Sequence, residues 1–516
     1  MSVAAVPEGW WIATIADVAK SSGGGTPPKS DSSYWSDGTV PWVSPKDMKT
    51  FLITASEDSV TSKALSRLTL IPSDSVLVVV RSGILSRTFP VSINKLPVTV
   101  NQDMRAFVPE TGIEARYIAW QFISNERDIL DRCSKDGTTV ASIEGPALAG
   151  YPLAIAPRDE QTRIVEKLEE LLSDLDAGVA ELKAARRKLA QYRQSLLKAA
   201  VEGALTADWR AARTQRGEPQ ETGATLLQRI LTERRTRWEA KQLAKFAEQG
   251  KTPPSGWQTK YPEPVSPDTA DLPALPDEWV WASVDQLSVE QKYGSSSKTN
   301  EDSSGVPVLR MGNIQDGGLD LGRLKYLSRE HNEFPALFLD DGDLLFNRTN
   351  SPELVGKTAV YRSQVVPCSY ASYLISVKVS PSCSPELVAA YINSGYGRMW
   401  VKSVVTQQVG QANVNGTKLA ALAVPLPPVD EQSEIVRILM AQSGSASDQQ
   451  VLIEHGLKQA TAQRKNILKA AFAGQLVPRD PNDEPASVLL ERIRAERAAD
   501  GAATSRKRGP KAKETA

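Results

Sequence analysis

The side chains that most often carry catalysis are scarce in this sequence. It has two histidines, His331 and His455, and three cysteines, Cys133, Cys368 and Cys383. Nucleophilic catalysis needs a base beside the nucleophile, and a zinc site needs closely spaced His or Cys ligands, and neither pattern occurs. The odd number of cysteines without a CxxC pair indicates a reducing compartment and no disulfide framework. We therefore expect no catalytic residue, no metal ligand and no bound cofactor.

Motifs for nucleotide and cofactor binding are also incomplete. The segment VGKT at 355–358 resembles the end of a phosphate-binding loop, but Ser351 stands where that loop requires glycine. The sequence has no strand–GxGxxG–helix unit, and no (Asn/Asp)-Pro-Pro-aromatic tetrapeptide of an amino-methyltransferase. Any chemistry associated with this chain would therefore have to come from partner proteins.

Polar loops offer the side chains that read DNA. Arg and Lys bind guanine O6 and N7, Asn and Gln bind adenine N6 and N7, and Ser and Thr bind phosphates or bases. Such loops also occur on many protein surfaces that bind nothing. The candidate DNA-binding residues of the first half are Lys29, Lys46, Arg81, Arg87, Gln102, Arg105, Lys135, Thr138 and Thr139. Those of the second half are Ser297, Lys298, Arg310, Asn313, Asn347, Arg348, Thr349, Asn350, Lys357, Gln411 and Asn413.

The elements that position these loops are present twice in the chain. PEGWWIATIADV at 7–18 recurs as PDEWVWASVDQL at 276–287, and DEQTRIVEKL from Asp159 recurs as DEQSEIVRIL from Asp430. SLLKAAVEGALT at 195–206 recurs as NILKAAFAGQLV at 466–477, and a shorter match joins LLQRILTER to LLERIRAER. A repeat this long is a duplicated module rather than a solenoid unit.

Each copy combines a globular half with a long helical half. The globular halves mix short β-branched runs with Gly, Ser, Asn and Pro loops and end in a helical stretch, which is typical of α+β domains. From Val165 the first helical half repeats apolar residues in steps of three and four, the pattern of a coiled-coil seam. We predict two tandem α+β domains separated by two long antiparallel coiled-coil helices with internal pseudo-two-fold symmetry.

Composition limits the location of any basic surface. Lys plus Arg and Asp plus Glu both number 61, so a nucleic-acid-binding surface must be local. No stretch reaches about eighteen consecutive apolar residues, and the start of the chain lacks the pattern of a secretion signal. We expect a cytoplasmic protein without membrane contact.

The repeated motifs resemble those of the specificity (S) subunits of type I restriction–modification systems, over essentially the whole chain. The resemblance is carried by the Pro–Trp entries, by the PxDEQ helix starts at 157–161 and 428–432, and by ILKAAFAGQLVPRDPNDEPASVLLERIRAER. The loop GDLLFNRTNSPELVGKTAVYR at 342–362 is similar to the recognition domains of that family.

The resemblance implies a non-catalytic subunit that reads an asymmetric, bipartite target in double-stranded DNA. It also implies docking of two methyltransferase (M) subunits, which methylate adenine, and two restriction (R) subunits, which translocate and cleave. The alternative is a coiled-coil scaffold that joins two ligand-binding domains. The expected segments are target-recognition domain 1 (1–158), a spacer helix (159–206), a helical connector with a Pro-rich linker (207–272), target-recognition domain 2 (273–429), a second helical region (430–501) and a disordered basic tail (502–516).

Overall fold

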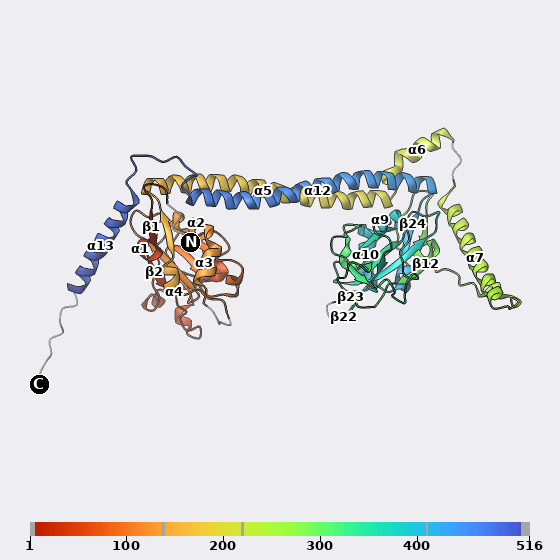
Figure 1. Cartoon of the computed structure of the whole chain (residues 1–516), viewed down its shortest axis with the longest axis horizontal. Helices are drawn as coiled ribbons and strands as arrows, with labels where there is room; N and C mark the ends of the chain where they lie inside the picture. The colour runs from red at the N-terminus through yellow and green to blue at the C-terminus, as the bar shows by residue number, and fades with distance from the viewer. Residues whose placement is uncertain (1–5, 136–139, 218–220, 409–410, 507–516) are drawn as a thin grey trace. The chain divides into compact units, whose positions relative to one another are not determined.

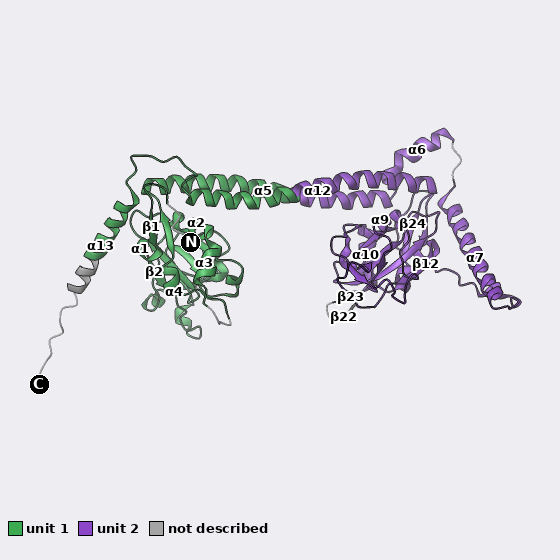
Figure 2. Ribbon diagram, viewed as in Figure 1, with its two compact units in different colours: residues 1–183, 454–516 green, residues 184–453 purple. Residues whose placement is uncertain are grey.

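The computed structural model forms two compact units, each built around its own globular domain (Figure 2). Unit 1 combines residues 1–183 with residues 454–516, and unit 2 contains residues 184–453. Two 44-residue helices, α5 (Arg158–Val201) and α12 (Val429–Phe472), each contribute one part to each unit. The structure describes residues 6–135, 140–217, 221–408 and 411–506.

The globular domain of unit 1 is an α+β fold, as predicted. A five-stranded sheet in the order β2-β9-β6-β7-β4 lies beside a three-stranded sheet, β5-β3-β8. The first and last strands of the domain, β1 and β10, pair in a separate two-stranded sheet. All four residues of β6 are buried, and α2 packs against β6 and β7. The strands are β1 (Trp11–Thr14), β2 (Ala19–Gly23), β3 (Val40–Val43), β4 (Leu52–Ile53), β5 (Asp58–Val60), β6 (Val76–Val79), β7 (Val91–Asn94), β8 (Thr99–Val100), β9 (Met104–Pro109) and β10 (Pro152–Ile155). The helices are α1 (Ile15–Val18), α2 (Ala115–Ser124), α3 (Glu126–Cys133) and α4 (Gly145–Ala149).

The globular domain of unit 2 repeats this plan. A four-stranded sheet, β12-β21-β17-β19, lies beside a β16-β13-β20 sheet and a β11-β24 ribbon, and two further small sheets are β14-β15 and β18-β23-β22. The strands are β11 (Val280–Ser283), β12 (Ser288–Tyr293), β13 (Val306–Leu309), β14 (Ile314–Gln315), β15 (Gly318–Leu319), β16 (Lys325–Leu327), β17 (Leu344–Asn347), β18 (Thr349–Asn350), β19 (Thr358–Val360), β20 (Ser369–Tyr370), β21 (Leu374–Val379), β22 (Thr406–Gln408), β23 (Gln411–Asn413) and β24 (Ala423–Leu426). The helices are α8 (Val284–Leu287), α9 (Pro385–Asn393), α10 (Gly395–Val404) and α11 (Gly416–Ala420).

Within each unit, α5 and α12 run antiparallel. In unit 1, Arg464 of α12 pairs with Asp176 of α5, and Leu182 packs against Gly456. In unit 2, the Tyr192 hydroxyl donates to Gln442 Oε1 at 2.6 Å. Residue numbers therefore rise along one helix while they fall along the other, and the predicted antiparallel pairing is confirmed within each unit.

The repeated Pro–Trp and glycine motifs contact each other at the end of each helix pair. In unit 2, Gly203 ends α5 with a φ of +76°, and a Cβ at this position would lie 2.5 Å from Pro276 and 3.3 Å from Trp279. In unit 1, Gly474 follows α12 with a φ of +66° and is packed in the same way against Pro7. Only glycine combines this backbone conformation with such a close approach. The spacer helix of one copy thus ends on the globular domain of the other copy.

The DEQ motif at the start of α12 takes part in the same group of contacts. In unit 2, the Glu431 carboxylate is fully buried and accepts hydrogen bonds from Trp279 Nε1 at 2.8 Å and Thr206 Oγ1 at 2.6 Å, and it also pairs with Arg210. The Gln432 side chain accepts from the backbone N–H of Ser384 at 2.8 Å. The motif therefore serves to fix the start of α12 to the globular domain.

Helices α6 (Ala207–Arg216), α7 (Gly223–Glu248) and α13 (Ala486–Arg506) complete the two units. Leu226 and Ile230 of α7 are buried in unit 2, and Leu489, Leu490 and Ile493 of α13 are buried in unit 1. The shorter sequence match thus corresponds to equivalent packing. Helix α13 also extends into the stretch predicted as a disordered tail, whose residues 507–516 lie outside the described residues.

Candidate nucleic-acid interface

Two polar loops that are distant in the sequence meet in unit 2. Strand β18 pairs with β23, with Thr349 opposite Asn413 and Asn350 opposite Ala412. Figure 1 shows β22 and β23 at the end of this globular domain that lies away from the helix pair. Pairing through the backbone holds both loops in one register, so their side chains form a common surface.

Arg348 lies at the centre of this surface. Its guanidinium is 4.9 Å from the centre of the Tyr293 ring and donates to the Ser372 carbonyl at 3.3 Å. It also approaches Asn413 Oδ1 at 3.5 Å, and the Asn413 amide donates to Thr349 Oγ1 at 2.7 Å. We call these residues, Tyr293, Arg348, Thr349 and Asn413, the Arg348 cluster. A fixed guanidinium beside an amide is the combination that suits base edges in the major groove.

Tyr293 was not among the residues expected from the sequence. Its side chain is 47% exposed, and its hydroxyl accepts a hydrogen bond from the backbone N–H of Gly416 at 2.7 Å. The ring therefore supports Arg348 while the hydroxyl holds the start of α11. An exposed aromatic residue at a strand end, just before the loop GSSSKT, was the signal available in the sequence.

Unit 1 places an arginine one residue beyond the equivalent location. Val79 of β6 lies opposite Met104 of β9 and Asn347 of β17 lies opposite Leu374 of β21, so Val80 is the counterpart of Arg348 and Arg81 is the counterpart of Thr349. Arg81 forms an isolated bridge with Ser142, which stands the same number of residues before Asp159 as Asn413 stands before Asp430. At the position of Tyr293, the last residue of its strand, unit 1 has Gly23 at the end of β2.

Two more predicted residues lie on segments that adjoin the Arg81–Ser142 bridge. The Arg105 guanidinium lies beside Gly145, where a Cβ would be 3.2 Å away, and the backbone N–H of Lys135 donates to the Ser142 carbonyl at 2.9 Å. We call Arg81, Arg105, Lys135 and Ser142 the Arg81 cluster. Its three cationic side chains suit an anionic ligand.

The other predicted residues are not members of either cluster. Lys29, Arg87, Lys298 and Gln411 are exposed, and Asn350 and Lys357 are half-buried. Gln102 accepts a hydrogen bond from Thr26, and Ser297 bonds to His331 at 2.9 Å. Lys46 lies 3.6 Å from Asp58 and 3.8 Å from Glu57, and both pairs are exposed. Thr138 and Thr139 lie outside the described residues.

The burial of two predicted asparagines argues against a role in DNA contact. The Asn313 side chain is 4% exposed, accepts from the Arg310 N–H at 2.9 Å and donates to the Asp320 carbonyl at 2.8 Å. Asn347 is fully buried, and its amide donates to the Leu354 carbonyl at 3.2 Å. Both amides hold loop backbone, so we remove them from the candidate set. Arg310 remains in it, half-buried, although its Nε is buried without a partner among the described atoms.

The structure also shows the state of the reactive side chains. The three cysteines are buried, and burial raises the pKa of the Cys368 and Cys383 thiols to about 12 and also raises the pKa of Cys133. Among the described residues, no group of three His, Cys, Asp or Glu side chains is placed to hold a metal ion. None of the described helices combines the length and apolar composition needed to span a membrane.

Comparison with protein families identifies the chain. The model of the type I restriction modification DNA specificity domain matches it twice, at residues 7–184 and 276–457. The chain belongs to this family of type I specificity subunits. Each match begins at a Pro–Trp entry and continues beyond the DEQ motif.

Individual specificity subunits agree with this assignment. The subunit of the EcoKI enzyme of Escherichia coli strain K12 is 26% identical over 516 residues, covering 97% of this chain and 98% of that protein. The EcoR124I/EcoR124II subunit of Escherichia coli is 38% identical over 189 residues, which is 36% of this chain and 47% of that one. A solved structure from a study of assembly and conformational transition in the type I system covers 92% of this chain at 15% identity, with a TM-score of 0.59, and shares its fold.

Proposed function

We propose that this specificity subunit reads an asymmetric, bipartite DNA target, with one half-site bound by each globular domain. The observation that carries the proposal is that an arginine, Arg81 or Arg348, follows the equivalent strand of each sheet, at positions one residue apart. In each unit the arginine lies beside a second loop that supplies Ser142 or Asn413. Bidentate arginine contacts are the commonest base-specific contacts in the major groove.

The two clusters differ in a way that favours unlike half-sites. Asn413 offers an amide, which suits adenine, whereas Ser142 offers only a hydroxyl. The ring of Tyr293 packs against the Arg348 guanidinium, whereas Gly23 at the equivalent position has no side chain. The two domains would therefore select different bases, which is expected of an asymmetric target.

Docking of two M and two R subunits is part of the same proposal. In unit 2, helix α12 exposes apolar side chains: Met440 is 57% exposed, Val451 63% and Leu452 69%. Exposed apolar residues gathered on one helix are typical of a protein interface. M subunits bound here would supply adenine methylation, and R subunits would supply translocation and cleavage.

The proposal is tested by mapping methylated adenines in a host that expresses this chain with the methyltransferase subunit of its own system. We expect a new split motif with two unlike halves. Replacing residues 273–429 with the second domain of another specificity subunit should change one half and leave the other unchanged. A soluble complex of the two proteins that leaves the genome unmodified would contradict the proposal and favour a scaffold.

Tyr293 provides a finer prediction. Replacing Tyr293 with leucine removes both the ring and the hydroxyl, whereas phenylalanine removes only the hydroxyl. Loss of the cation–π contact should cost about 0.5–2 kcal/mol of binding to the mapped target. We expect Tyr293→Leu to bind the target more weakly than Tyr293→Phe in a fluorescence anisotropy titration. Equal affinities of the two variants would show that the ring does not support Arg348 in the complex.

A further inference from the structure

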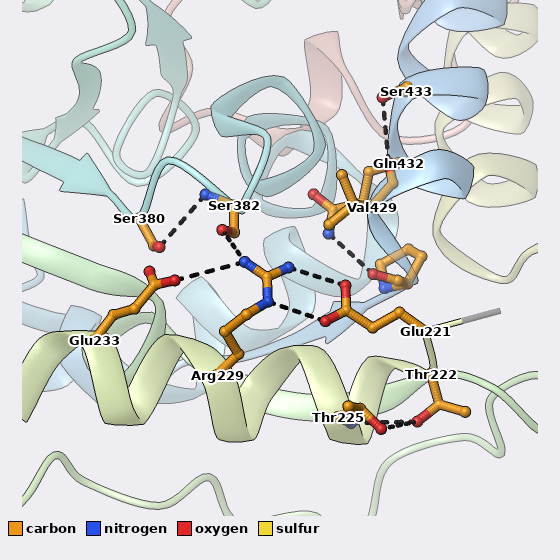
Figure 3. Close-up of polar contacts among 11 residues, drawn as sticks. Glu221, Thr222, Thr225, Arg229, Glu233, Ser380, Ser382, Val429, Gln432 and Ser433 are labelled. Atoms are coloured by element: carbon orange, nitrogen blue, oxygen red, sulfur yellow. Dashed lines mark hydrogen bonds and ion pairs between the residues drawn. The ribbon is translucent and has the colours of Figure 1, made fainter.

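The connector between the two copies forms a projecting helix in unit 2 whose base is firmly fixed. Figure 3 shows Arg229 of α7 between Glu221 and Ser382. Its Nε and Nη2 donate to the Glu221 carboxylate at 3.0 and 2.9 Å, and Nη1 donates to Ser382 Oγ at 2.7 Å. Together with the buried Leu226 and Ile230, these bonds hold the first turns of α7 against the globular domain.

Arg234, one turn beyond Ile230, still pairs with Asp285 of the globular domain at 3.0 Å. The helix then leaves the domain, and the following segment folds back along it. We call residues 231–260 the α7 arm. Trp257 stacks on Trp238 with ring centres 5.7 Å apart, and Phe246 meets Trp257 edge-on at 6.1 Å. Tyr261, just after the arm, is 8% exposed and packs on Trp238 at 5.4 Å. The sequence predicted a Pro-rich linker after the helix. The aromatic contacts of Trp257 and Tyr261 instead pack the first part of this linker against α7.

The α7 arm carries a positive stripe in a chain whose net charge is zero. It contains seven Lys and Arg residues and three Glu residues, a net charge of +4. Arg237, Lys241 and Lys245 are exposed, and none of them forms an ion pair within the described part of the chain. Four-residue spacing places them on one face at intervals of about 6 Å. Like charges at this spacing destabilise an isolated helix, so the stripe favours an anionic partner.

The direction of the arm indicates which partner this is. Within unit 2, Figure 1 shows α7 running from the end near the helix pair to the level of β22 and β23, which lie on the opposite side of the globular domain, along the edge away from the helix pair. A duplex bound along that edge extends beyond the half-site. Its phosphates, with one negative charge per about 1.7 Å of axis, would then lie close to the arm.

We propose that Arg237, Lys241 and Lys245 bind the DNA backbone beside the half-site read by the second domain, without reading bases. The inference rests on the proposed function, because bound DNA is what brings phosphates to the arm. Contacts of this type add affinity for any sequence and fix the orientation of the protein on the duplex.

The test compares two triple variants of the full chain, co-expressed with its methyltransferase subunit. One carries Arg237→Gln, Lys241→Gln and Lys245→Gln, and its matched control carries Arg237→Lys, Lys241→Arg and Lys245→Arg. The probe is a random-sequence duplex of about 60 base pairs, titrated by anisotropy between about 50 and about 200 mM salt. Circular dichroism should show full helix content in both variants, since neither change removes a buried contact.

We expect the glutamine variant to reduce the slope of log affinity against log salt by about 3, since each phosphate contact contributes about 0.9. A four-fold rise in salt should then weaken wild-type binding roughly 40-fold more than binding by the glutamine variant. The charge-keeping variant should match the wild type, and the methylated motif should be the same in all three proteins.

Three outcomes would overturn the inference. An unchanged slope in the glutamine variant, with Arg348→Ala still losing target preference, refutes the arm contact alone. An unchanged slope together with loss of the co-purifying subunit assigns the stripe to an acidic protein surface. Absence of any DNA binding by the wild-type complex refutes both the arm contact and the proposed function.

Discussion

Replacing Arg348 with alanine is expected to relax recognition of one half-site while the other half-site is still read. The guanidinium is held by Tyr293, by the Ser372 carbonyl and by Asn413, so its approach to a base is fixed before binding. Loss of one bidentate base contact should cost about 1–3 kcal/mol on the target and much less on random DNA. Competition titrations with the two duplexes measure this difference.

Arg81→Ala is the matched variant in unit 1. It should relax the opposite half of the methylated motif, because Arg81 follows the equivalent strand of the first sheet and bridges to Ser142 as Thr349 pairs with Asn413. Lys298→Ala serves as a control, since this exposed lysine is expected to bind phosphate and should weaken target and random DNA equally. If Arg348→Ala also weakened both duplexes equally, Arg348 would be a backbone contact rather than a reader of bases.

A large loss of stability is expected for Glu431→Ala. The buried carboxylate accepts from Trp279 and Thr206 and pairs with Arg210, which is itself only 20% exposed. Removing one partner of a buried ion pair leaves the other without compensation, and we expect a loss of about 3 kcal/mol in the free energy of unfolding. Hydrogen exchange of the first turns of α12 and a thermal melt of the full chain measure the loss.

Glu160 occupies the equivalent position in unit 1 and should respond differently. Its Oε2 is buried without a partner among the described atoms, and burial raises its pKa above the ordinary value of 4.5, although the Trp10 hydrogen bond opposes this. Glu160→Gln should therefore be neutral or stabilising. Because the unfolded chain loses this proton first, the advantage of the variant should grow as pH rises through the two pKa values and vanish below them. A variant less stable than the wild type at neutral pH would contradict this.

Sequence reasoning recovered the elements better than the contacts among them. The repeat and the heptad steps predicted a spacer helix over 159–206, and α5 spans Arg158–Val201. Periodicity records which face of a helix is apolar, but it does not identify the partner of that face. The role of Gly203 and Gly474 was therefore found only in the structure, where each packs against the Pro–Trp entry of the other copy.

In the candidate interface too, the sequence predicted the residues but not which of their side chains meet. Arg348 and Thr349 were predicted on one loop and Asn413 on another, and the β18–β23 pairing brings the two loops together. Asn347, one residue before Arg348, was also predicted to contact DNA. It is fully buried, because adjacent residues of a strand point to opposite faces. Loop composition alone does not separate an amide that holds backbone from one that faces a ligand.

The division of the chain between the two units has a consequence for its synthesis. Unit 2 is continuous, so every residue of it has been made once the ribosome has passed Ile453. Unit 1 begins the chain, yet Leu489, Leu490 and Ile493 complete its core, and Gly474 covers Pro7. Domains usually fold in the order in which they emerge. Here the globular domain that emerges before unit 2 closes only after unit 2 has been made, so its apolar surface stays open to chaperones until Ile493 has been made.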